Sequence, residues 1–469
     1  MEERKIIPFT MNYYALKTFG RQQYSNPWAA LSELIANGYD AGADKVYLYI
    51  DMRNKDHAII EVIDSGSGMD INDVEGKYVE IGRNRRIEEP DDTSTGRKGI
   101  GKLAALYLSD VYEVITVKEG QMTAWSVDTR GKTDKEIPSL VATNPDDIPI
   151  CCSLVWDQLR ESHGTIIRLS EVNLSRIGDR YIDGLRRRLS DYFLLSSDSR
   201  RLLLAIIRTD EDYKSYVSNG LEYFAPVEKQ IAFDNMSHIL CSSPELLHCT
   251  KGTFKVPYKN KRGENKTAQF SREVILFPKE IEEPGPKTRI PLSGKMMING
   301  REKEYSVEGW IGVHSTIESE PAQENDSRFV RNSMYTPNRL RIYIRKKLAN
   351  DSFLSRLNLV GTYANYLEGE ISFDILDDND LEDITTTNRQ DFSVDDERVV
   401  LLKRITRGLC RQLISLRQKL ADKVNEIKDS EDGRIIAAQK SRFALETHKD
   451  LISAGIPDDR ADELSLVFC

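Results

Sequence analysis

Cysteines, long apolar runs and targeting signals are scarce in this 469-residue chain, and each absence excludes a class of protein. Six cysteines, none of them in a CxxC pair, cannot form a disulfide framework in a chain of this length. No apolar run approaches the roughly 18 residues that a membrane span requires. Residues 1–5 lack the apolar core of a secretory signal. These absences predict a protein of the reducing cytoplasm with no membrane partner.

Positive charge is not in excess either. Lysine and arginine number 66 and aspartate and glutamate 75, which gives a net charge of −9. This balance argues against a protein coated in cations for bulk nucleic-acid binding, although it allows a local basic patch. Hydrophobic residues make up 39% of the chain and charged residues 30%, the balance of a folded protein. At roughly 150 residues per domain, the length predicts about three folded units.

Changes of pattern divide the chain into five segments. Asn26-Pro27 is typical of a helix start, the runs at 45–50 and 58–63 are typical of strands, and residues 82–98 have no apolar period. We expect an N-terminal strap over 1–25, a mixed domain over 26–175, a connecting region over 176–255, a second mixed domain over 256–394 and a helical region over 395–469.

Apolar residues after position 395 recur at steps of three or four, with a mean step of 3.5. This spacing predicts a long helix with an apolar seam. A helix packed on its own domain and an oligomerisation helix explain the seam equally well. The seam consists of Val399, Leu402, Ile405, Leu409, Leu413, Leu416, Leu420, Val424 and Ile427.

Three polar residues of the first domain, Glu33, Asn37 and Asp40, stand at i, i+4 and i+7 of an expected helix. That spacing directs all three to one side of the helix. A carboxylate and an amide oxygen one turn apart can hold a hydrated hard cation and orient a water molecule. Taken alone, the pattern also fits a solvated polar face.

A first glycine-rich corner, residues 64–69 (DSGSGM), directly follows the strand at 58–63. Its glycines allow the backbone to approach a ligand closely. Asp64, at the end of the strand, is placed to accept a hydrogen bond from an exocyclic amine. In isolation, the same residues also fit an ordinary Asx turn.

A second glycine-rich corner, residues 95–104 (TGRKGIGKLA), opens a helix and would present free N–H groups to phosphate. It nearly matches a P-loop, but Leu103 replaces the Ser or Thr that binds magnesium. It also nearly matches a dinucleotide fingerprint, but residues 88–94 upstream form a poor strand. Neither motif explains this corner.

Together with a strand at 163–169 (HGTIIRL), these segments resemble in order and spacing the N, G1, G2 and final threonine boxes of the GHKL ATPases. That superfamily includes gyrase, heat-shock chaperones, histidine kinases, MutL and MORC proteins. The resemblance covers roughly residues 25–170. It implies an α+β fold class: a Bergerat-type α/β sandwich that binds ATP and Mg²⁺ beneath a polar lid, followed by a transducer-like domain and a C-terminal helical region.

The resemblance also implies a role for each matching residue. Glu33 would activate the attacking water, Asn37 would ligate Mg²⁺, and Asp64 would bond the adenine amino group with support from Thr165. The remaining residues implied to contact the nucleotide are Asp40, Gly66, Gly68, Met69, Ile81, Gly82, Gly96, Arg97, Lys98, Gly99, Ile100, Gly101 and Lys102.

The second mixed domain resembles the transducer of the heat-shock chaperone and MORC branches, in which a cation reaches the ATP site. Arg389 is the first candidate for this cation, and Lys346 or Lys347 the second. A surface arginine in a loop is the alternative interpretation of Arg389. The histidine-kinase branch is disfavoured because no histidine precedes His57.

The sequence therefore predicts a Mg²⁺-dependent ATPase that forms an ATP-dependent homodimer. A MORC-like protein that acts on DNA, in genome or antiviral defence, is the first hypothesis. A chaperone-like ATPase acting on protein clients and a nucleotide-gated scaffold for a separate effector are the alternatives. The candidate DNA-contacting segment contains Lys259, Lys261, Arg262 and Lys266.

Overall fold

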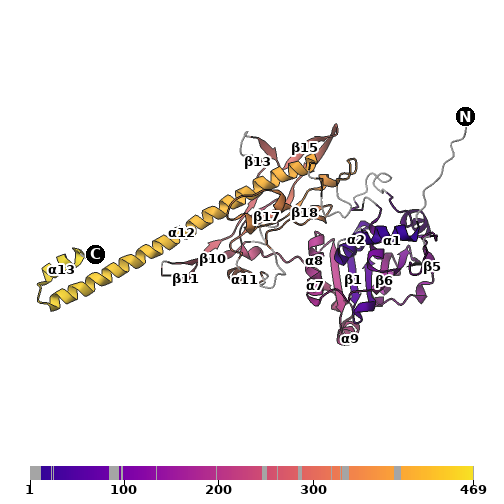
Figure 1. The fold of residues 1–469 in the computed structure, drawn as a ribbon, viewed down its shortest axis with the longest axis horizontal. Helices are drawn as coiled ribbons and strands as arrows, with labels where there is room; N and C mark the ends of the chain where they lie inside the picture. The colour runs from indigo at the N-terminus through magenta and orange to yellow at the C-terminus, as the bar shows by residue number, and fades with distance from the viewer. Residues whose placement is uncertain are drawn as a thin grey trace.

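The computed structural model describes residues 12–467 except for 23, 25, 84–93, 97–98, 134, 197, 244, 246–250, 261, 284–287, 318, 328, 330–336, 385–391 and 394. Two sheet-containing domains follow one another, and a long helix extends away from the second (Figure 1). The expected fold class is confirmed: large mixed sheets are covered by helices. No helix within the described ranges is long and apolar enough to cross a membrane.

The first domain is built on an eight-stranded mixed sheet with the order β5-β4-β3-β6-β2-β1-β7-β8. Strand β1 pairs antiparallel with β2 and parallel with β7. The strands are β1 (Lys45–Asp51), β2 (Ala58–Asp64), β3 (Val111–Lys118), β4 (Gln121–Asp128), β5 (Val141–Thr143), β6 (Gly164–Val172), β7 (Arg201–Ile207) and β8 (Ala225–Pro226).

Helices cover both faces of this sheet, which is why its central strands are apolar on both sides. Leu48 and Ile50 of β1 belong to the core beneath one set of helices, whereas Tyr49 belongs to the opposite core. The first set is α1 (Tyr13–Gln22), α2 (Pro27–Asp40), α5 (Ala104–Leu108), α7 (Asp179–Asp183) and α8 (Leu185–Tyr192), and the second is α6 (Ser153–Leu159) and α9 (Asp210–Asn219).

The first sheet continues past the boundary expected at residue 175. Strands β7 and β8 lie within the expected connecting region 176–255, yet they complete this sheet. The next strand, β9 (Met236–Cys241), belongs to the second sheet. The connecting region is therefore divided between the two domains. Strand β7 is a continuous apolar run, but its parallel partner β1 lies far earlier in the chain, so no local pattern shows which sheet it joins.

The described part of the expected N-terminal strap, α1, packs against α5 of its own domain. Leu16 is buried there, and Gly20 permits close contact because a Cβ at that position would lie 3.0 Å from Cβ of Leu106. Tyr14 and Phe19, on the other face, are 67% and 61% exposed.

The second domain has a six-stranded sheet with the order β12-β9-β17-β20-β18-β19. Three two-stranded hairpins surround it, together with α11 (Ser319–Asn325). The sheet's other strands are β12 (Glu273–Leu276), β17 (Glu308–His314), β18 (Leu340–Ile344), β19 (Lys347–Asn350) and β20 (Leu367–Ser372), and the hairpins are β10 (Thr253–Lys259) with β11 (Asn265–Ser271), β13 (Glu280–Glu282) with β14 (Arg289–Pro291), and β15 (Ser293–Ile298) with β16 (Arg301–Ser306).

The predicted C-terminal helix is α12 (Glu397–Ser453), and its seam packs first on its own domain. The seam residues from Val399 to Leu413 are fully buried in the core of the second domain. Leu420 and Val424 then pack against the β10–β11 hairpin. Beyond that point α12 projects from the domain, and α13 (Asp458–Val467) folds back on it (Figure 1).

A buried polar junction joins the two domains. The carboxylate of Asp191, at the end of α8, lies 3.0 Å from Nε of Arg341 on β18. The hydroxyl of Tyr343 donates to the backbone oxygen of Asp191 at 2.7 Å. Lys229, between the domains, pairs with Glu370 and donates to the Tyr343 hydroxyl at 2.9 Å. Because buried charges are costly without their partners, this junction restricts how the domains can sit on one another.

Candidate active site

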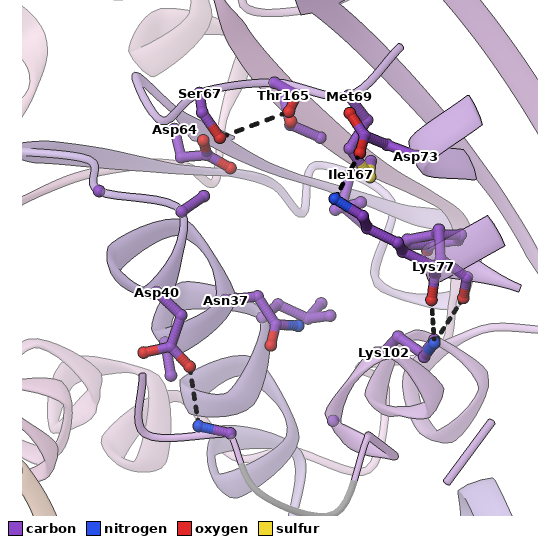
Figure 2. Close-up of a pocket in the computed structure, with 18 of the residues that line it drawn as sticks. Asn37, Asp40, Asp64, Ser67, Met69, Asp73, Lys77, Lys102, Thr165 and Ile167 are labelled. Carbon is purple, nitrogen blue, oxygen red and sulfur yellow. Dashed lines mark hydrogen bonds and ion pairs between the residues drawn. The ribbon is translucent and has the colours of Figure 1, made fainter. Parts of the chain in front are cut away.

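A cavity of about 550 Å³ opens between α2 and the two glycine-rich corners, within the size range of small-molecule sites. Figure 2 shows polar side chains from several elements facing it. The predicted residues that line it are Glu33, Asn37, Asp40, Asp64, Gly68, Met69, Gly96, Gly99, Gly101, Lys102 and Thr165.

The other predicted nucleotide-contacting residues lie behind or beside this cavity. Gly66 sits behind Asp64 and donates its N–H to that carboxylate at 2.9 Å. Ile81 and Ile100 pack on the core of the first domain, and the N–H of Gly82 donates to the oxygen of Gly99 at 3.4 Å. Arg97 and Lys98 lie outside the described residues.

Helix α2 presents Glu33 and Asn37 to the cavity. Its first turn is capped by Asn26, whose side-chain oxygen accepts from the N–H of Ala29 at 3.0 Å. A Cβ at Gly101 would lie 3.2 Å from Oε2 of Glu33 and 3.4 Å from Oδ1 of Asn37. The glycine therefore lets the second corner approach both oxygens. The side chain of Asn37 forms no hydrogen bond with any residue that the structure describes.

Asp64 is a buried carboxyl at the deep end of the cavity. Burial raises its pKa to about 6, although the N–H of Gly66 and the nearby His163 both favour the charged form. Such a group is available as a hydrogen-bond acceptor at neutral pH without a strongly bound protein cation. This environment suits an uncharged donor such as an amine on a heterocycle.

The first corner is held by a threonine that the sequence did not single out. Oγ1 of Thr116, on β3, accepts from the N–H of Met69 at 2.8 Å and lies 3.3 Å from Oγ1 of Thr165. Gly68 has φ +66°, and a Cβ there would come within 1.8 Å of the oxygen of Val117. Only glycine fits at that position. Thr116 gave no sequence signal because a lone threonine in a strand usually faces a sheet neighbour.

The pKa of Asp64 predicts that affinity for an adenine nucleotide weakens in acid. Below pH 6 the free protein carries a protonated Asp64, so binding that requires the carboxylate must release a proton. We expect the Kd to rise about tenfold per pH unit below that value. Titrations at several pH values between 7 and 5 measure this slope. Asp64→Asn is the control, since its remaining slope reports the titration of the nucleotide's own phosphates; equal slopes would contradict the prediction.

Asp40 anchors the carboxyl end of the expected lid. Its carboxylate accepts hydrogen bonds from the N–H groups of Thr95 and Gly96, each at 2.9 Å, and from the Thr95 hydroxyl at 2.8 Å. In this conformation protein donors therefore occupy Asp40, which ties α2 to the start of the second corner (Figure 2).

Lys102 also has protein partners. Its ammonium donates to the backbone oxygens of Lys77, Tyr78 and Glu80, at 3.2, 2.5 and 2.6 Å. Lys77 and Tyr78 end the short π-helical segment Val74–Tyr78, and Glu80 follows it, so Lys102 fastens the end of that segment beside the cavity. A contact from Lys102 to phosphate would compete with these carbonyls.

A lysine of the second domain enters the site of the first. Nζ of Lys347 lies 2.7 Å from Oε1 of Glu33, and the two side chains are only 9% and 14% exposed. Backbone contacts hold this position: Lys347 forms a β-bridge with Phe193, and the N–H of Leu194 donates to the oxygen of Lys346 at 2.9 Å. The side chain of Lys346 is exposed, and Arg389 lies outside the described residues.

The same β18–β19 hairpin also contacts the end of the lid. Arg345 and Lys346 form its turn with φ +50° and +65°. Nη1 of Arg345 donates to the oxygen of Ser94 at 3.3 Å, and Nη2 donates to Oδ1 of Asn379 at 2.6 Å. Sequence reasoning missed Arg345 because its target, a backbone oxygen 251 positions away, has no sequence signature.

Residues 24–165 match the family model described as "Histidine kinase-, DNA gyrase B-, and HSP90-like ATPase". This match confirms the resemblance of the first domain to the GHKL superfamily of ATPases, which was drawn from the four boxes.

Over 436 residues, 90% of its length, the chain is 25% identical to a protein of Herpetosiphon aurantiacus named "Putative type II restriction enzyme HgiDII". The chain spans 59% of the length of this relative.

Proposed function

We propose that this chain binds ATP with Mg²⁺, hydrolyses the terminal phosphate bond, and couples that step to the seating of its second domain on the first. The observation that carries the proposal is the contact between Lys347 and Glu33. It brings a cation from one domain onto the candidate general base of the other. A catalytic site assembled from two domains is active only when they are docked.

The residues of the cavity suit a magnesium nucleotide. The buried carboxyl of Asp64 would accept a hydrogen bond from the adenine amine, and the glycine at 101 leaves room beside Glu33 and Asn37. Oδ1 of Asn37 would ligate the cation, with phosphate oxygens and water as its other ligands. When bound, Mg²⁺ neutralises charge on the phosphate oxygens.

Glu33 would accept the proton of the attacking water, because its carboxylate faces the cavity one turn before Asn37. In the present conformation, however, Oε1 of Glu33 accepts a hydrogen bond from Nζ of Lys347. A bound terminal phosphate would draw the lysine toward its own charge and free Glu33 to orient water. The ammonium would then stabilise charge that develops on the phosphate during hydrolysis.

We further propose that the substrate on which this cycle acts is DNA, as in the MORC branch, and that two copies associate when ATP is bound. The relative's name as a restriction enzyme supports DNA and fits a role in genome defence. A chaperone-like action on protein clients and a non-catalytic scaffold are the competing proposals.

Phosphate release from ATP by the purified protein tests the proposal. We expect release that requires Mg²⁺ and rises on addition of duplex DNA but not of an unfolded protein. Stimulation by unfolded protein alone would support the chaperone-like alternative. Binding of a non-hydrolysable ATP analogue without any phosphate release would support the scaffold, and no binding at millimolar concentration would overturn the proposal.

A further inference from the structure

The β10–β11 hairpin is a two-stranded ribbon with one apolar face and one polar face. Phe254 and Val256 of β10 are buried against Leu420 and Val424 of α12. The hydroxyl of Tyr258 donates to Oε2 of Glu431, also on α12, at 2.6 Å. The ribbon is therefore braced along the long helix and lies away from the first domain (Figure 1).

The polar face of the ribbon is exposed and carries no carboxylate on its strands. The register pairs Lys255 with Gln269 and Lys259 with Asn265, and all four residues are exposed. At the turn stands Arg262, also exposed. Lysine and arginine side chains donate hydrogen bonds and carry positive charge, and the amides of glutamine and asparagine also donate. This face therefore suits a negatively charged partner rich in hydrogen-bond acceptors.

Charge is concentrated in this ribbon against the trend of the chain. Residues 253–271 contain five lysines and arginines and one glutamate, a net charge of +4 in a chain of net charge −9. Lys255 pairs with Glu324 at 3.0 Å and Lys266 lies 3.7 Å from Glu264. Lys259 and Arg262 form no salt bridge with any residue in the described ranges. Lys261 belongs to the same charge count but lies outside those ranges.

We infer that the exposed face of the β10–β11 ribbon binds duplex DNA, with Lys259 and Arg262 contacting its phosphates. The inference rests on the proposed DNA-acting function and names the surface through which it would operate. The major groove of B-form DNA admits a two-stranded ribbon, whereas the narrow major groove of double-stranded RNA does not. Phosphate contacts by lysine and arginine supply most of the affinity in such an interface.

The test is a salt titration of binding to a labelled DNA duplex, followed by fluorescence anisotropy. The double variant Lys259→Gln, Arg262→Gln should bind about tenfold more weakly at low salt, and its plot of log K against log salt should be shallower by about two units. The matched control, Lys214→Gln with Arg186→Gln, removes two exposed charges of the first domain and should behave as wild type. ATP turnover without DNA should be unchanged in both double variants.

The possible failures are distinguishable. If the wild-type protein binds DNA and the ribbon variant matches the control in affinity and salt slope, the ribbon inference is wrong while the DNA-acting function stands. If the wild type does not bind duplex DNA at low salt, both are overturned. Equal affinity for double-stranded RNA of the same sequence would contradict the major-groove interpretation.

Discussion

Replacement of Glu33 by glutamine should lower ATP turnover by a factor of about 10² to 10⁴, the usual contribution of a general base. Glutamine keeps the size of the side chain but cannot accept the proton of the attacking water. Nucleotide affinity should change little, since Asp64 and the glycine corners remain intact. The variant should therefore bind ATP and retain it unhydrolysed.

Single-turnover phosphate release and calorimetric titration with ATP separate the two effects in Glu33→Gln. Glu211→Gln, an exposed position on α9, is the matched control and should hydrolyse ATP at the wild-type rate. Hydrolysis by Glu33→Gln at the wild-type rate would remove Glu33 from the proposed chemistry. Loss of both binding and turnover, with a normal melting temperature, would instead indicate that Glu33 holds the nucleotide.

The largest effect after Glu33 is expected at Lys347. Lys347→Met keeps an unbranched side chain of similar length but removes the ammonium that lies 2.7 Å from Glu33. If this cation moves to the phosphate during hydrolysis, its loss should reduce kcat by about 10³, as for other cations supplied from outside a nucleotide pocket. ATP affinity should fall much less, because the effect belongs to the transition state.

Lys346→Met is the matched control for Lys347. The side chain of Lys346 is exposed, and its contact with the first domain is made by its backbone oxygen, which accepts from the N–H of Leu194. Turnover by this control should stay within a few fold of wild type. Lys347→Arg should restore part of the lost rate, because the charge is kept but its geometry differs. Faster hydrolysis by Lys347→Met would contradict the proposal, since it would mean that the lysine only blocks Glu33.

Much of the candidate site could be predicted from the sequence because its signals are local. Glu33, Asn37 and Asp40 share one side of a single helix through their spacing alone. Each glycine-rich corner directly follows a strand or precedes a helix, so Asp64 and Gly101 could be placed in one candidate site, and both line the same cavity. The same holds for the long helix, whose seam of period 3.5 is contained in one segment.

Other features depend on where distant segments meet, and no local pattern records that. The apolar seam of α12 did not reveal whether it would cover its own domain, because a core face and an oligomer face have the same composition. The role of Asp40 in holding Thr95 likewise arises from contact between α2 and a loop 55 positions later.

The choice between Lys346 and Lys347 separates most clearly what the sequence can predict from what only the tertiary structure decides. The sequence by itself predicted a GHKL-like domain and, after it, a second mixed domain with the adjacent lysines Lys346 and Lys347. Neighbouring residues at the start of a strand point to opposite sides, so only one of the two lysines can face the cavity. The tertiary structure decided which of them does. The turn at Arg345 and Lys346 and the β-bridge between Lys347 and Phe193, the residue after α8, fix the start of β19 so that Lys347 contacts Glu33.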